Sequence, residues 1–270
     1  MPYILSEINI YPIKSLGGIS LLSSEVTDRG LKYDRRWMLV DENNKFMTQR
    51  QIPEMALLRV HLMETGLQVQ HKTLNIESLY IPFLNEVQIL KQAYLKVEIW
   101  DDVCDAIEVN EEINQWFSLV LKQNCKLVYM PDNSLREVEK KYAFNNEITS
   151  FSDAYPLLII GQSTLEELNG KLEEKLPMNR FRPNLVYTGG LSFEEDVWKE
   201  FKINTVNFIC AKPCARCNVT TTNQETAEIG KEPLKTLSTY RKVGNKILFG
   251  QNLLNEGTGV ITVGEKLLIN

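Results

Sequence analysis

The chain has 270 residues, of which 43% are apolar and 24% are charged, and its formal net charge is −5. This composition is ordinary for a soluble globular protein with one large core or two modest domains, and the negative charge argues against a general binder of nucleic acid or membrane surfaces. No apolar run approaches the roughly 20 residues that span a bilayer, and the amino terminus lacks the basic and apolar regions of a signal peptide.

The first hundred residues predict a series of short β-strands. These segments alternate apolar and polar residues or are rich in β-forming residues, and short turns separate them. The pattern favours a small antiparallel barrel or sandwich over βαβ units. The predicted strands are Tyr3–Ile13, Arg36–Asp41, Leu57–Met63, Gly66–His71, Leu74–Ile81 and Tyr94–Trp100.

Two helices are predicted in the remainder of the chain. Asn110 can cap the first helix, which continues to Leu121. Ser163 starts the second helix, where Glu166 completes a capping box, and Pro177 ends it. Further predicted strands are Asn184–Thr188, Val206–Ile209, Lys246–Phe249 and Val260–Val263.

These elements predict a mixed, mainly β fold. A boundary near residue 120 would divide the chain into one unit of residues 1–120 and another of residues 121–270. No internal repeat and no low-complexity linker marks this boundary.

Three of the five cysteines, Cys210, Cys214 and Cys217, lie within eight residues. Thiolates this dense, in a chain with only two histidines, indicate soft-metal or redox chemistry. Lys212 and Arg216 are expected to lower the pKa of a neighbouring thiol. Any single cysteine is more often a small buried hydrophobic residue. The odd cysteine count and the missing export signal predict a cytoplasmic location.

Three kinds of metal site compete for this segment. A zinc site usually takes four Cys or His ligands, but Cys104, Cys125, His61 and His71 are scattered far upstream. The C-x3-C-x2-C spacing matches the iron–sulfur loop of radical enzymes that cleave S-adenosylmethionine, but too little chain follows Cys217 to build their α/β barrel. The third interpretation is one exposed thiolate on a metal whose other ligands come from a cofactor.

Several cations stand at predicted strand ends or turns. Arginine forks and lysine point charges at such positions suit a phosphate group. Sequence alone does not indicate that the positions converge. The positions are Lys14 beside Ser15, Arg35 with Arg36, Arg50, and Arg180 and Arg182 before Asn184.

Seven segments, taken in order, resemble one known family. They are YPIKS (11–15), DRRWMLVDENNKFMTQR (34–50), FSDAYPLLII (151–160), TLEELN (164–169), RFRPNLVYTGG (180–190), CARCNVTTTNQETAEIGKEPLKTLSTYR (214–241) and FGQN (249–252). Together they are similar to proteins in which a MOSC domain follows an amino-terminal MOSC β-barrel domain, such as mitochondrial amidoxime-reducing components and their bacterial counterparts. The resemblance implies an amino-terminal β-barrel-like domain and a MOSC β-barrel core with a few flanking helices.

The resemblance also implies a molybdenum cofactor, Mo-molybdopterin, with one protein cysteine on the metal. The family pattern C-x-R-C puts that metal ligand and catalytic residue at Cys217. Residues that hold the pterin and its phosphate match Lys14, Ser15, Arg35 and Arg182. Positions near the cofactor match Asp153, Asn184 and Arg216. Cys210 and Cys214 are not ligands by this analogy.

The activity that the resemblance implies is the reduction of N-hydroxylated compounds to amines or amidines and water, at a metal that cycles between Mo(VI) and Mo(IV). Substrates would be amidoximes, hydroxylamines or N-hydroxylated bases. Protons would come from water or from Asp153, because no histidine lies in the carboxy-terminal half.

Electrons are expected from a separate electron-transfer protein or flavin reductase. The chain ends at Asn270 without the iron–sulfur domain of some bacterial relatives, and Gly17-Gly18 and Gly189-Gly190 are isolated pairs, not a dinucleotide-binding motif. The membrane anchor of the mitochondrial relatives is also missing, so no membrane association is expected. A different class of function stays open, namely a non-catalytic carrier of the molybdenum cofactor or of its sulfur. Sulfurase activity is not expected, because the pyridoxal-phosphate domain of those enzymes is missing.

Overall fold

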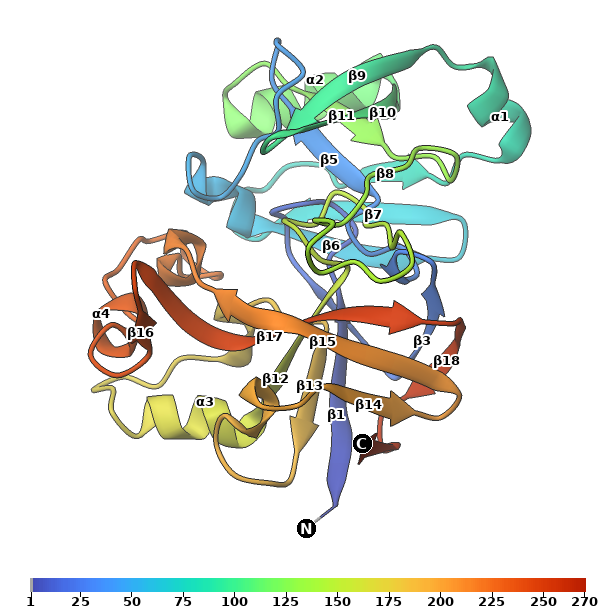
Figure 1. Ribbon diagram of the computed structural model, residues 1–270. Helices are drawn as coiled ribbons and strands as arrows, with labels where there is room; N and C mark the ends of the chain where they lie inside the picture. Colours follow the sequence, from blue (N-terminus) through green and yellow to red (C-terminus); the bar gives the residue numbers. More distant parts are fainter. Residues whose placement is uncertain (1) are drawn as a thin grey trace.

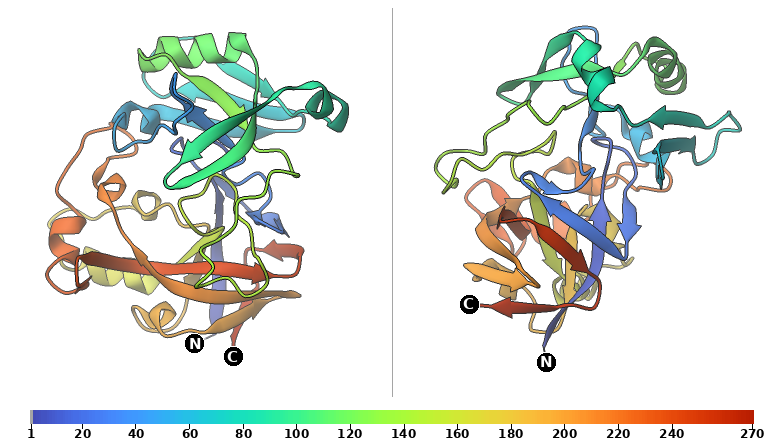
Figure 2. Two further views of the ribbon diagram at one scale, coloured as in Figure 1. Left: turned by 45° about the horizontal axis from the view of Figure 1, so that its top comes forward. Right: turned by 90° about the vertical axis from the view of Figure 1, so that its right-hand side faces the viewer.

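Two β-rich halves make up the molecule, and Figure 1 shows them one above the other. The computed structural model describes residues 2–270. The lower half in Figure 1 is built around long strands from both ends of the sequence, whereas the upper half carries smaller sheets from residues 37–129. Figure 2 shows that both chain termini lie at the far end of the lower half.

A closed barrel of seven strands forms the lower half within residues 2–270. Its last strand, β17, pairs with β12 as well as with β15, so the sheet returns to its starting strand. Closure leaves no unpaired edge on these strands and encloses an apolar core that includes Leu5, Phe208 and Leu253. In order around the barrel the strands are β12 (Leu157–Gly161), β13 (Leu185–Thr188), β1 (Tyr3–Ile10), β19 (Lys266–Ile269), β14 (Glu200–Ile203), β15 (Val206–Ala215) and β17 (Lys246–Glu256).

Two smaller sheets form the upper half. They enclose a second apolar core, in which Trp37 and Leu39 of one sheet meet Leu58 and Leu67 of the other. One sheet has the order β5 (Trp37–Val40), β11 (Lys126–Tyr129), β10 (Asp102–Glu108) and β9 (Tyr94–Ile99), and the other consists of β6 (Leu58–Met63), β7 (Gly66–His71) and β8 (Leu79–Pro82).

Short strands complete the lower half. They pair with the long barrel strands or form a small sheet of their own. They are β2 (Ile19–Leu21) on β1, β16 (Lys242–Val243) on β17, and the separate sheet β18 (Gly259–Thr262), β3 (Ser23–Thr27) and β4 (Gly30–Leu31).

The helices are few and short in the described part of the chain. None of them is both long and apolar enough to cross a bilayer within residues 2–270. The α-helices are α1 (Glu86–Lys91), α2 (Glu111–Leu121), α3 (Gln162–Asn169) and α4 (Leu234–Leu237), and the 3₁₀ turns are η1 (Pro53–Leu57), η2 (Met178–Arg180), η3 (Glu194–Asp196) and η4 (Asn218–Thr221).

The mainly β fold, with barrels and a few flanking helices, is therefore confirmed. The predicted cap of α2 is confirmed too, because the Asn110 side chain accepts a hydrogen bond from the Ile113 amide at 2.8 Å. The division into residues 1–120 and 121–270 stays a prediction. In the structure β1 from the first of these segments pairs with β13 and β19 and completes the barrel.

Several predicted boundaries are wrong. The helix expected from Ser163 is capped at Gly161 without a side-chain hydrogen bond, and it ends at Asn169, well before Pro177. The strand expected at Leu74–Ile81 begins only at Leu79. The strand expected at Val206–Ile209 continues to Ala215, so Cys210 and Cys214 lie on β15 and not in a loop.

Candidate functional site

A cavity of about 300 Å³ lies where the loops around the barrel meet the turns beside β1 and β5. Its lining residues come from distant parts of the sequence, including residues 14–50, 152–158, 181–184 and 212–219. The structure therefore brings together every residue that the sequence predicted for the site. Those lining residues are Lys14, Ser15, Arg35, Asp153, Arg182, Asn184, Arg216 and Cys217.

Tyr11 lies behind the cavity wall and contacts two of the lining arginines. The guanidinium carbons of Arg35 and Arg182 lie 4.3 and 4.2 Å from the centre of its ring, so the ring contacts two cations. The Tyr11 hydroxyl donates a hydrogen bond to the Pro183 carbonyl at 3.0 Å. Burial raises the pKa of Tyr11 to about 12, so the ring stays neutral.

The two arginines on Tyr11 differ in their polar contacts. Arg35 forms a salt bridge with Asp34 and donates to the Asn184 side chain at 3.0 Å. Within residues 2–270, the Arg182 side chain has no hydrogen-bond or salt-bridge partner, and burial lowers its pKa to about 10. Arg182 therefore stays charged at neutral pH and can bind an anion that enters the cavity.

Left-handed backbone conformations mark three of the predicted residues. Ser15, Arg35 and Arg182 have φ angles of 68°, 49° and 55°. A non-glycine residue in this region costs of order 1 kcal/mol or more, and such residues cluster at ligand-binding sites. Here they turn the chain sharply beside the cavity.

Lys14 and Asp153 form an ion pair on the cavity wall. The Lys14 Nζ lies 2.6 Å from the Asp153 Oδ1 and donates to the Phe151 carbonyl at 2.8 Å. The Lys14 side chain is 5% exposed, whereas that of Asp153 is 67% exposed. Burial lowers the pKa of Lys14 to about 8, because the loss of hydration costs the ammonium more than the Asp153 charge restores.

The proton-donor role predicted for Asp153 does not fit this geometry. Burial by itself would raise the pKa of Asp153, but the charge and hydrogen bond of Lys14, together with the Arg50 charge, hold it well below its usual range. An ionised carboxylate has no proton to donate at neutral pH. Asp153 fits better as the anion that fixes the Lys14 side chain.

The cysteine segment supplies a further part of the cavity lining with Cys214, Arg216 and Cys217. Arg216 donates to the Phe181 carbonyl at 2.6 Å and to the Cys214 Sγ at 3.0 Å, while its buried Nε has no partner. Cys217 precedes η4 and lines the cavity half-buried, and its thiol makes no hydrogen bond within the described chain.

Cys210 does not line the cavity. Its pKa is raised to about 12 by burial, so the expected lowering by Lys212 and Arg216 is wrong for this thiol. The physical reason is that Lys212 turns towards the rings of Tyr142 and Tyr155 and pairs with Glu139.

No protein-only metal cluster forms from the cysteines. Across residues 2–270, no three His, Cys, Asp or Glu side chains gather in a way that could hold a metal ion. Cys104 and Cys125 are buried in the upper half, away from the cavity lining.

Some residues at the site carry no signal in the sequence that predicts their place there. Tyr11 belongs to the YPIKS segment, but nothing in the sequence indicated that arginines from residues 35 and 182 would lie against its ring. Tyr155, Lys212 and Asn252, which were not expected at the site, line the cavity. Arg50 was noted among the cations, but not as a site residue.

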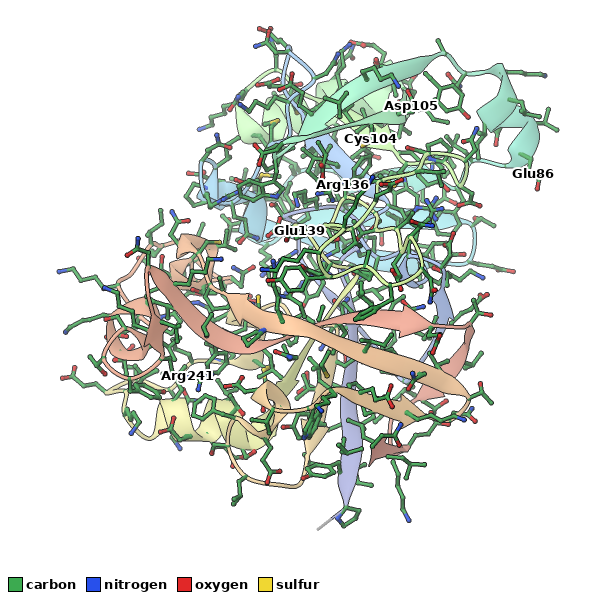
Figure 3. The ribbon with its side chains drawn as sticks, viewed as in Figure 1. Glu86, Cys104, Asp105, Arg136, Glu139 and Arg241 are labelled. Carbon is green, nitrogen blue, oxygen red and sulfur yellow. The ribbon has the colours of Figure 1, made fainter. Side chains whose placement is uncertain are left out.

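Arg136 holds the loop that carries Asp153. This arginine is 5% exposed and donates to the carbonyls of Ser150, Ser152 and Asp153 at 3.0, 2.6 and 3.0 Å, and it pairs with Asp102. In the view of Figure 3, Arg136 lies between the upper sheets and the barrel.

Arg136→Met is expected to lower the free energy of unfolding by about 2–3 kcal/mol, because several carbonyls lose a charged donor. Denaturant unfolding measures this loss. Lys96→Met serves as the control, because it breaks an ion pair in which both side chains are well exposed, and should cost under about 1 kcal/mol. Equal losses for the two variants would contradict the role of Arg136.

Two family models match the chain. The MOSC N-terminal beta barrel domain matches residues 3–124, and the MOSC domain matches residues 146–268. The chain is 30% identical to mitochondrial amidoxime-reducing component 1 of Mus musculus, over 98% of this chain and 82% of that protein. The chain belongs to the MOSC family.

Other members of the MOSC family are similar to this chain to a comparable degree. Mitochondrial amidoxime reducing component 2 of Rattus norvegicus is 30% identical, over 97% of this chain and 81% of that protein. Molybdenum cofactor sulfurase of Arabidopsis thaliana is 32% identical over 93% of this chain, but the match covers only 33% of that protein. The chain thus spans most of the length of the amidoxime-reducing relatives and about a third of the sulfurase.

Proposed function

We propose that this protein is a molybdenum-cofactor-dependent oxidoreductase that reduces N-hydroxylated compounds, with electrons from a separate redox partner. The observation that carries the proposal is the convergence of the Cys217 thiol and the Arg182 guanidinium on one cavity. Within residues 2–270 this guanidinium has no polar partner. Amidoximes, hydroxylamines and N-hydroxylated bases are the proposed substrates. The names of the amidoxime-reducing relatives, which match over most of their length, support this choice.

The charges around the cavity fit a cofactor that carries a phosphate. Arg182 lacks a polar partner within the described residues, and the buried Nε of Arg216 also lacks one. A buried donor without a partner costs about 1–3 kcal/mol, which a phosphate or pterin acceptor would recover. Lys14 and Arg35 add positive charge, each already oriented by a carboxylate.

The donor set also fits a soft metal. The Cys217 thiol lines the cavity without a hydrogen bond, so it is available as a thiolate ligand. No His lines the cavity within residues 2–270, and the other lining cysteine, Cys214, already accepts a hydrogen bond from Arg216 at 3.0 Å. The remaining ligands would therefore come from the cofactor. This is the third of the metal interpretations that the sequence left open.

When bound, the molybdenum cofactor supplies the two-electron redox chemistry of the reaction. The chain's own residues would bind and orient the cofactor. Cys217 would anchor the metal, and Arg182, Arg35 and Lys14 would hold the phosphate and pterin by charge-assisted hydrogen bonds. Asp153, as an anion, keeps the Lys14 ammonium in place, and water is the proposed source of protons.

The deciding experiment has two parts. Protein expressed in a host that makes the cofactor should contain molybdenum and pterin in equal amounts, and it should reduce benzamidoxime with reduced viologen as the electron donor. A non-catalytic carrier would contain the cofactor and release it to an apo-enzyme, but it would not turn over benzamidoxime. Cofactor-loaded protein that transfers its cofactor and reduces no N-hydroxylated compound would therefore replace the proposal with the carrier function.

Electron supply gives a further prediction. The purified holoprotein should show no flavin or iron–sulfur absorbance and no benzamidoxime reduction with NADH alone. Within residues 2–270 no three Cys, His, Asp or Glu side chains gather to hold a metal, and the sequence has no dinucleotide motif. Adding a flavin reductase and a small electron carrier should start turnover. NADH-driven turnover by the pure protein, or stoichiometric iron, would contradict the prediction.

A further inference from the structure

Arg50 lines the cavity but has no role among the proposed contacts to the cofactor. It follows β5 in a turn and lines the same cavity as Arg182 and Cys217. Its guanidinium carbon lies 4.0 Å from the centre of the Trp100 ring. Within residues 2–270 its side chain forms no hydrogen bond and no salt bridge.

The other cations around the cavity, Arg182 excepted, already have polar partners. Lys14 pairs with Asp153, Arg35 pairs with Asp34, Lys212 pairs with Glu139, and Arg216 donates to the Phe181 carbonyl. Arg182 and Arg50 are thus the two guanidinium groups of the cavity lining whose side chains make no hydrogen bond and no salt bridge at all within residues 2–270. A single phosphate group bound by Arg182 would leave Arg50 without an anionic partner.

The two arginines are both half-buried, but their aromatic partners differ in exposure. Arg182 is stacked on Tyr11, which is 3% exposed, whereas Arg50 is stacked on Trp100, which is 41% exposed. Arg182 therefore belongs to the buried end of the cavity and Arg50 to its solvent end. A substrate must enter from the solvent end.

Trp100 is itself held in place, which orients Arg50. Its indole N–H donates to the Asp153 Oδ1 at 3.3 Å, and its ring contacts Phe46 at a centroid distance of 5.1 Å. Its φ angle of 57° places it in the tight turn between β9 and β10. An arginine stacked on a fixed aromatic ring keeps its planar N–H fork available for a carboxylate.

We infer that Arg50, stacked on Trp100, is the substrate anchor of this cavity and selects N-hydroxylated substrates that carry a carboxylate. This inference rests on the proposed function for the identity of the reacting group. The anion site itself depends only on Arg50, Trp100 and the cavity.

The test compares benzamidoxime with 4-carboxybenzamidoxime, which differ by one carboxylate. Binding of each compound to the holoprotein is measured by calorimetry without an electron donor, and KM is measured with reduced viologen. The wild-type protein should prefer the carboxylated compound by about tenfold or more. Arg50→Met should remove this preference in both measurements, and Arg50→Lys should retain only part of it, because lysine keeps the charge without the planar fork.

The control variant is Lys202→Met, which removes one positive charge from an exposed position on β14. It should keep the wild-type preference, so a general effect of net charge would be recognised. Molybdenum and pterin content is measured in every variant. A loss of cofactor in Arg50→Met as large as in Arg182→Ala would assign Arg50 to the cofactor and overturn the inference.

An equal affinity of the wild-type protein for both compounds would also overturn the inference that Arg50 anchors the substrate carboxylate. A preference that survives in Arg50→Met would overturn it too. Failure of the proposed function is distinguishable from these results. Holoprotein that binds the carboxylated compound through Arg50 but reduces neither compound would refute the reductase and leave the anion site standing.

Discussion

Cys217→Ser is expected to abolish benzamidoxime reduction and to lower the molybdenum content of the protein severalfold or more. A serine hydroxyl is a harder and far less acidic ligand than a thiol, so it replaces a thiolate poorly on a soft, sulfur-rich metal. Metal analysis, pterin fluorescence and turnover with reduced viologen measure the effect together. Pterin is expected to fall less than activity, because the phosphate contacts of the cofactor remain.

The matched control is Cys210→Ser. Cys210 lies on β15, seven residues before Cys217, but does not line the cavity, and its thiol stays protonated through burial. This variant should retain the metal. Equal metal loss in both variants would show that the single-ligand interpretation is wrong and that a site with several cysteines must be reconsidered.

Arg182→Ala is expected to lower the affinity for the cofactor by roughly tenfold or more, because a charge-assisted contact to phosphate contributes about 1.5–3 kcal/mol. Pterin content after dialysis measures this loss. The substitution also removes one of the two cations on the Tyr11 ring, so unfolding is followed in parallel to separate a stability effect from a binding effect.

Lys202→Ala is the control for Arg182→Ala, since Lys202 is exposed on β14 and far from the cavity lining. It should leave the pterin content unchanged. A variant Arg182→Ala that folds and retains the full pterin content would refute the phosphate role of Arg182. The pterin content of Arg182→Lys is expected to lie between those of Arg182→Ala and Lys202→Ala, because lysine keeps the charge and loses the bidentate geometry.

Local sequence signals were reliable where the local residues decide the structure. The alternation of apolar residues predicted β7 (Gly66–His71) with the bounds that the structure has. Asn110 caps α2 as predicted, because the cap depends only on one side chain and an amide three residues later. These elements hold together through contacts that are close in sequence.

Local signals failed where tertiary pairing decides. The cysteine segment contains Pro213 and was expected to leave the strand after Ile209, but pairing with the long strand β17 carries β15 to Ala215, with register shifts after Cys210 and Pro213. The capping box expected at Ser163 does not form, because the chain already enters α3 from Gly161 at the end of β12. Sheet partners from distant segments outweigh these local preferences.

The sequence by itself determined the residue types of the site and the family to which the chain belongs. Cys217, Arg182 and Lys14 could be named from their segments. Only the tertiary structure decided how these residues meet, because the barrel and the turns beside it bring residues 14, 182 and 217 to one cavity. It also decided their charges and partners. The Lys14 ion pair and the Arg50 charge, against the effect of burial, make Asp153 an anion that holds Lys14, while the side chains of Arg50 and Arg182 form no salt bridge within residues 2–270.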